Sequence, residues 1–111
     1  MIILQEAADQ FGWQFIKRIE SLTSLVDCLV IIIPTWSMKD LNLVEGLSIR
    51  INSLGVPVYL LDIDVCRLQE EMVDLFGNIP PIRQSPVIVK YVNGALGKME
   101  QGESVTGFFG D

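Results

Sequence analysis

The chain has 111 residues, which suits a single domain with its own core, and half of its residues are hydrophobic. A formal net charge of −6 and the absence of a basic stripe argue against nucleic acids and anionic membrane surfaces as partners. Because the chain has no histidine, Ser–His–Asp and Cys–His catalysis and most kinds of zinc site are excluded.

Helical and extended patterns alternate from the N-terminus onward. Residues 1–12 form an extension, within which 5–11 are expected to be helical. The segment 14–19 predicts a strand, and 20–27 predict a short helix. The continuous β-branched run 28–34 then predicts a strand that is buried on both faces.

The middle of the chain predicts a long helix and a second buried strand. Leucine and isoleucine side chains recur on one helical face over about 37–54. Ser37 suits the N-cap of this helix, and Gly55 suits its C-terminal stop. The segment 56–64 then predicts the second buried strand.

The last third predicts one more helix and a hairpin. Apolar residues from Val65 onward share one helical face, and a breaker-rich loop over 77–86 follows. A strand is expected over 86–92, and the Asn93-Gly94 pair behind it is a hairpin turn signal. Residues 96–102 are therefore expected to return as an edge strand.

The resulting order, β-α-β-α-β-α-β-β, predicts a single α/β domain over 1–111. Consecutive β-α-β units imply right-handed crossovers, and the terminal hairpin adds antiparallel strands, so the sheet is mixed. The first ten residues lack the basic start of a signal peptide, and no apolar run is long enough to span a bilayer. Together with two distant cysteines and no CxxC motif, this predicts a cytoplasmic protein with reduced thiols.

This element order and its landmarks resemble thioredoxin from about Phe15 to Gly102. "FIKRIES" is similar to the family's first strand and helix, and "LVIIIPTW" to the central strand that leads to its tryptophan. "VYLLDID" is similar to the next central strand, and "SPVIVKYVNGALGKMEQG" to the segment from the cis-proline onward. The resemblance implies a three-layer α/β/α fold with four to five strands and a truncated C-terminal helix.

The resemblance also identifies an emptied redox site. The family's tryptophan is followed by Cys-Gly-Pro-Cys, and those positions here hold Ser37, Met38, Lys39 and Asp40. Dithiol exchange needs one thiolate to attack and a second thiol to resolve the mixed disulfide. Without both sulfurs the chain is not expected to be an enzyme, and no cofactor is expected.

Two buried polar positions of the family have become apolar as well. The acid that lies five residues before the tryptophan in thioredoxins corresponds to Ile31, and a lysine near it corresponds to Leu60. Glu45 lies near the place of the proline that bends the family's active-site helix. A buried charged pair is costly to keep once its chemistry is gone. These losses agree with the missing sulfurs.

A recognition groove is what the resemblance leaves in place. The residue before the family's cis-proline offers backbone hydrogen bonds to an extended peptide, so a cis Ser85–Pro86 bond is expected. Met38, Lys39 and Asp40 are expected to be exposed, and Pro80-Pro81 either extend the groove or form a surface insertion. Trp36 lies either at the groove rim or as an ordinary half-buried aromatic. The predicted groove consists of Trp36, Ser37, Met38, Lys39, Asp40, Ser85 and Pro86.

The cysteines and carboxylates outside the groove offer weaker candidates. Cys66 opens the third predicted helix, where it is either a residual reactive thiol or incidental, whereas Cys28 is expected in the core. The carboxylates that begin at Asp62 and Asp64 suggest either a divalent cation site or a solvated strand end. Because their spacing matches no known loop, no metal is expected.

Three functions remain open at this point. The first is a non-catalytic adaptor or chaperone-like module that contacts a protein partner, as phosducin-like proteins and hydrogenase-maturation chaperones of the superfamily do. The second is a structural subunit of a homo-oligomer or larger complex, since only Val105, Phe108 and Phe109 replace the family's C-terminal helix. Either the N-terminal helix or a partner subunit must then cover that face. The third is an atypical single-cysteine thiol-disulfide oxidoreductase.

Overall fold

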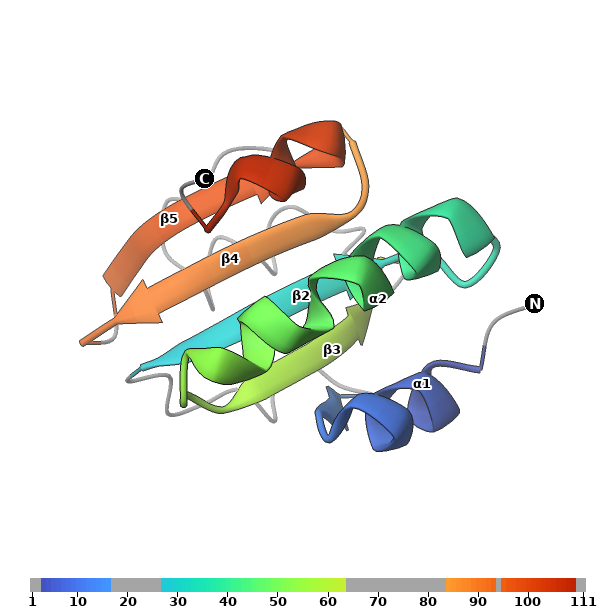
Figure 1. Ribbon diagram of the computed structural model, residues 1–111, viewed down its shortest axis with the longest axis horizontal. Coiled ribbons are helices and arrows are strands. Elements are labelled where there is room, and N and C mark those ends of the chain that lie inside the picture. Colours follow the sequence, from blue (N-terminus) through green and yellow to red (C-terminus); the bar gives the residue numbers. More distant parts are fainter. Residues whose placement is uncertain (1–2, 17–26, 64–83, 94, 110–111) are drawn as a thin grey trace.

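Five strands form one mixed sheet in the order β1-β3-β2-β4-β5 (Figure 1). The computed structural model describes residues 3–16, 27–63, 84–93 and 95–109. Within them lie two α-helices, a 3₁₀ helix and five strands: α1 (Leu4–Phe11), β1 (Gln14–Ile16), β2 (Cys28–Ile33), α2 (Met38–Ser53), β3 (Val58–Asp62), β4 (Val87–Val92), β5 (Ala95–Gln101) and η2 (Gly102–Gly107).

The central strand β2 is buried along its whole length, as its β-branched run predicts. It pairs in parallel with β3 and antiparallel with β4. Ile31 therefore lies between Leu60 on one side and Ile88 on the other, and all three side chains are fully buried. The α/β class and the mixed sheet are confirmed.

Helix α2 begins and ends close to its predicted limits. The Ser37 hydroxyl accepts a hydrogen bond from the Asp40 backbone N–H at 3.2 Å, which caps the first turn. The helix buries Val44, Leu47 and Ile51 against the sheet. The helix is followed by a turn at Gly55, whose φ of +69° is a conformation that glycine adopts without steric cost.

The predicted N-terminal helix is present as α1, and Trp13 joins it to the C-terminal end of α2. The Trp13 indole N–H donates to Asn52 Oδ1 at 2.7 Å, and Asn52 Nδ2 donates to the Phe11 carbonyl at 3.1 Å. The Phe11 and Trp13 rings lie 4.7 Å apart between centroids. These contacts fix α1 at the β1 edge of the sheet, where it contacts β1 and β3.

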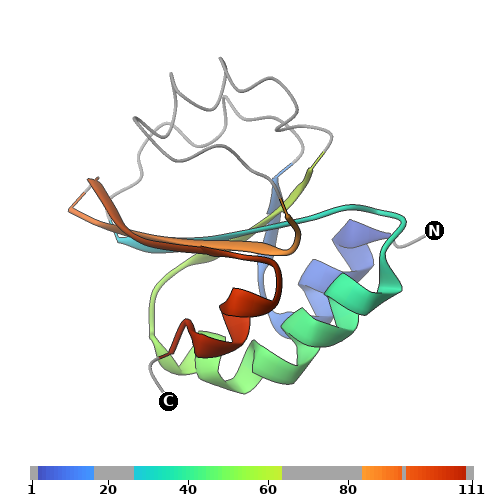
Figure 2. The same ribbon diagram turned by 90° about the horizontal axis from the view of Figure 1, so that it is seen from above.

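Figure 2 shows α1, α2 and η2 on the same side of the sheet. At the opposite end from α1, η2 contacts β4 and β5 and buries Val105, and Phe108 follows it into the same core cluster. The N-terminal helix and this short C-terminal element therefore share the cover of the face that thioredoxins close with a longer helix. A partner subunit is not required to bury it.

The terminal hairpin forms as predicted, and β5 lies at the edge of the sheet. Val92 pairs with Ala95 across the turn, and Asn93 takes a φ of +54°. The Asn93 backbone N–H donates to Asp27 Oδ1 at 2.9 Å, which ties the turn to the start of β2.

Several predictions fall outside the described residues. The strand predicted over 14–19 is described as far as Ile16, and the helix over 20–27 lies outside the described ranges, as does the one that begins at Val65. The same holds for the Pro80-Pro81 loop and for the second helical layer. None of the helices in the described part combines the length and apolar character needed to cross a bilayer.

Candidate functional site

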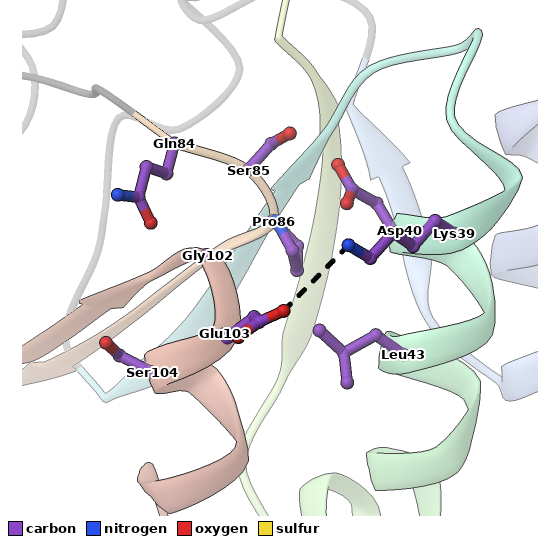
Figure 3. Close-up of a pocket in the computed structure, with 9 residues that line it drawn as sticks. All are labelled: Lys39, Asp40, Leu43, Gln84, Ser85, Pro86, Gly102, Glu103 and Ser104. Carbon is purple, nitrogen blue, oxygen red and sulfur yellow. Dashed lines mark ion pairs between the residues drawn. The ribbon is translucent and has the colours of Figure 1, made fainter.

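A surface pocket of about 350 Å³ lies where the N-terminus of α2 faces the loop before β4 and the junction between β5 and η2 (Figure 3). Three segments that are distant in sequence thus meet at one place. The described residues that line the pocket are Lys39, Asp40, Leu43, Gln84, Ser85, Pro86, Gly102, Glu103 and Ser104.

The Ser85–Pro86 peptide bond is cis, as predicted from the sequence. Two hydrogen bonds hold this loop against the C-terminal segment of the sheet. The Pro86 carbonyl accepts from the Gly102 N–H at 2.9 Å, and the Gln84 N–H donates to Gln101 Oε1 at 3.2 Å.

The conformation at Gly102 favours glycine in this wall. Its φ of +64° favours glycine, and the Gln84 side chain occupies the space that a Cβ at this position would need. The Gly102 backbone and the Gln84 side chain therefore form this wall of the pocket together.

Asp40 departs from the sequence-based expectation. Its position in the first turn of α2 predicts exposure, but its side chain is only 6% exposed, so the prediction was wrong for this residue. Figure 3 shows the carboxylate pointing toward Ser85. Asp40 Oδ2 is buried and has no hydrogen-bond partner.

An ion pair crosses the pocket mouth from α2 to η2. Lys39 Nζ lies 3.9 Å from Glu103 Oε1, and both side chains are more than four-fifths exposed. Such a solvated pair adds little stability. It does, however, balance one of the pocket's two negative charges.

The other predicted groove residues, Trp36, Ser37 and Met38, are not among the lining residues of the pocket. Trp36 is 68% exposed, so the half-buried alternative does not hold, and Met38 is 57% exposed. Ser37 uses its hydroxyl for the helix cap. Trp36 and Met38 thus each expose an apolar side chain near the start of α2, and their part in binding stays a prediction.

Below α2 the sheet has no polar side chain at the two positions singled out by the resemblance. Ile31 and Leu60 are direct neighbours in the register of β2 and β3, and both belong to the core cluster beneath α2. Packed aliphatic side chains therefore occupy both positions.

The Cys28 thiol lies in the core on the opposite face of the sheet, as expected. Burial, and then the nearby Asp27 carboxylate, raise its pKa from the ordinary 9.0 to about 11. A thiol with so small a thiolate fraction near neutral pH is a poor nucleophile. Cys66 lies outside the described residues.

Titratable side chains do not gather into a metal site within the part of the chain that the structure describes. No group of three or more Cys, Asp or Glu side chains is arranged there to hold an ion. Asp62 ends β3, whereas Asp64 lies outside the described ranges.

No protein-family model matches the chain, and its sequence has no significant match among curated proteins. Solved structures give a clear likeness. Thioredoxin O1 from Arabidopsis thaliana in its oxidised state superposes with a TM-score of 0.62 at 15% identity, over 86% of this chain and 89% of the thioredoxin. The fold is thioredoxin-like.

Two further structures agree with this fold. One, from yeast, concerns the thiol-resolving mechanism of mitochondrial 1-Cys peroxiredoxin and has a TM-score of 0.56 at 11% identity, over 87% of this chain and 90% of its own. The other is a designed protein, which superposes with a TM-score of 0.60 at 17% identity, over 86% of this chain and 81% of the designed protein. At such identities the likeness concerns the fold alone.

Sequence reasoning missed five of the residues that line the pocket. Leu43 was assigned only to the apolar face of a helix, and Gln84, Gly102, Glu103 and Ser104 were not considered as part of a site. The one local signal was the glycine that ends the last predicted strand. Nothing in the sequence places that turn against a helix that begins some sixty residues earlier.

Proposed function

We propose that this chain is a non-catalytic, thioredoxin-fold binding module, of adaptor or chaperone-like type, that contacts a protein partner through the pocket at the start of α2. One observation carries the proposal: the pocket between α2 and the cis-Pro86 loop persists, while the described residues that line it carry no sulfur. A serine and an aspartate stand where the family has its two cysteines.

The surroundings of the pocket support recognition. Trp36 and Met38 expose apolar surface beside it, and tryptophan often anchors protein interfaces. The backbone of Ser85, next to the cis-proline, corresponds to the position that pairs with extended peptides in the resembling family. A partner segment is therefore expected to lie along Ser85 and to contact Trp36.

Site-specific photo-crosslinking in the native source tests this proposal. A benzoyl-phenylalanine at position 36 or 38 is expected to capture a defined partner protein, and the same group at Ile49 is not. Ile49 is a matched control because it is 85% exposed and lies on the same helix, about 16 Å along the axis from Met38. Equal capture at 38 and 49 would argue against this surface.

Absence of redox catalysis is the second part of the proposal. Insulin reduction by dithiothreitol is expected to proceed at the uncatalysed rate in the presence of the protein. An acceleration that disappears in Cys66→Ser would favour the single-cysteine oxidoreductase instead. The buried Cys28, with its raised pKa, is a poor candidate for that activity.

A structural subunit of a homo-oligomer is the other candidate, and β5 favours it. Within the described residues this edge strand pairs with β4 alone, and its first half, from Ala95 to Lys98, is exposed. Light scattering after size exclusion separates the two candidates. A monomer at micromolar concentration would argue against the oligomer.

A further inference from the structure

A buried carboxylate oxygen without a partner distinguishes Asp40 from the other charged side chains of the described residues. Asp40 is the buried charged residue in that part of the chain, and its Oδ2 atom accepts no hydrogen bond. Buried polar atoms in folded proteins nearly always have a partner, and a buried carboxylate is costly without one. The side chain lines the pocket and points toward Ser85 (Figure 3). A donor group of a ligand in the pocket could approach this carboxylate and offset the missing hydrogen bond.

The charge of the pocket selects a cation. Lys39, Asp40 and Glu103 are the charged side chains among its described lining residues. Lys39 pairs with Glu103 across the mouth, so the charge of Asp40 is left unbalanced. The whole chain is also acidic, with a net charge of −6, which favours the approach of a basic partner.

The size of the pocket is compatible with a single long side chain. Its volume of about 350 Å³ is at the lower end of the range of about 300–1,000 Å³ typical of sites for whole small molecules. A bare metal ion fits poorly, because hard cations take about six or more oxygen ligands and Glu103 is already paired. Leu43 and Pro86 provide apolar walls against which an aliphatic stem or a flat guanidinium can pack.

We infer that the pocket is a subsite for an arginine side chain of the partner, whose guanidinium donates to the Asp40 carboxylate. Arginine suits the site better than lysine, because its planar guanidinium is less hydrated and offers several donors to a carboxylate. The arginine belongs to the segment that lies along Ser85. This inference rests on the proposed function and names the chemistry that the partner must carry.

Peptide titration followed by ¹H–¹⁵N NMR tests the subsite. The probe is the acetylated and amidated peptide Gly-Val-Arg-Val-Gly, and its control has citrulline, the neutral isostere, in place of arginine. The arginine peptide is expected to shift the amide signals of Asp40, Ser85 and Gly102, and to bind about tenfold or more tightly than the citrulline peptide. Asp40→Asn should reduce the affinity for the arginine peptide to the citrulline level, whereas Glu45→Gln, which removes an exposed charge from the same helix, should not.

Other outcomes overturn the inference and remain distinct from a failure of the proposed function. Equal affinity for the two peptides on the wild-type protein would overturn the arginine subsite, yet binding at the Ser85 loop would still support a peptide groove. If neither peptide shifts the pocket signals, the subsite is also overturned, and crosslinking at positions 36 and 38 then decides the proposed function independently. The comparison of the two peptides uses the unmodified protein, so it does not depend on the folding of a variant.

Discussion

Two regions that touch the same helix have opposite character. Beneath α2 the buried side chains of Ile31, Leu60 and Ile88 are all apolar, and β2 is paired with a neighbouring strand on each side. The pocket at the N-terminus of α2 instead contains a buried carboxylate that lacks a partner. The first region is packed with aliphatic side chains, whereas the second holds a polar group at a cost in stability. This difference supports the proposal that the pocket serves recognition.

Placing an acid beneath α2 should produce the largest effect. Ile31→Asp places a charge in a fully buried strand whose neighbours offer it no hydrogen bonds, so we expect the free energy of unfolding to fall by about 3–5 kcal/mol. Urea denaturation followed by circular dichroism measures the loss. Ile49→Asp, at an exposed position on α2, is the control and should cost less than about 1 kcal/mol. Similar losses in both variants would remove the contrast between core and surface.

The Cys28 thiol should make stability depend on pH in the alkaline range. Its pKa is about 11 in the folded chain and about 9.0 when unfolded, so the unfolded state releases its proton first. Stability is therefore unaffected by this group below about pH 9 and falls as the pH rises from about 9 to about 11, by about 2 kcal/mol in total. Urea midpoints of the wild type and Cys28→Ala at pH 8 and at higher pH isolate this contribution. If the urea midpoints of the wild type and Cys28→Ala changed equally with pH, Cys28 would have the same pKa in the folded and unfolded chains and would not be buried as described.

Removing the unpartnered carboxylate should stabilise the protein slightly. Asp40→Leu replaces a buried charge with an apolar side chain beside Leu43 and Pro86, and we expect a gain of about 1 kcal/mol in the free energy of unfolding. Thermal denaturation of the free protein measures it, and Glu45→Leu controls for the lost charge on the same helix. A clear loss of stability in Asp40→Leu alone would mean that the carboxylate already has a stabilising partner in the free protein.

The ion pair at the pocket mouth should contribute least. A double-mutant cycle of Lys39→Ala and Glu103→Ala should give a coupling energy below about 0.5 kcal/mol, because both side chains are largely exposed. Chemical denaturation at low and high salt measures it. A coupling above about 1 kcal/mol would show that the pocket mouth, like the core, is part of what stabilises the fold.

Much of the fold was predictable because it depends on local patterns. The β-branched run of β2, the spacing of apolar residues in α2 and the turn signal at Asn93 each determine a single element. The element order then restricts the topology, since crossovers are right-handed and short connections join neighbouring strands. The cis bond before Pro86 followed from the resemblance and was confirmed.

The candidate site was predictable only in part. Sequence patterns and the resemblance gave the α2 N-terminus and the Ser85–Pro86 loop, but they gave neither the burial of Asp40 nor the wall that Gly102 and Gln84 form. Whether a polar residue in a first helical turn is exposed depends on what packs against that turn. Here that surface comes from residues about fifty positions later.

By itself, then, the sequence determined the elements of the described residues, their order and the absence of cysteine at positions 37 and 40, because these depend on residue types and on spacings of a few positions. Only the tertiary structure decided that Asp40 is enclosed without a partner and that Lys39 reaches Glu103. Burial and charge pairing between distant segments depend on how those segments pack in the tertiary structure. A local sequence pattern therefore does not predict them.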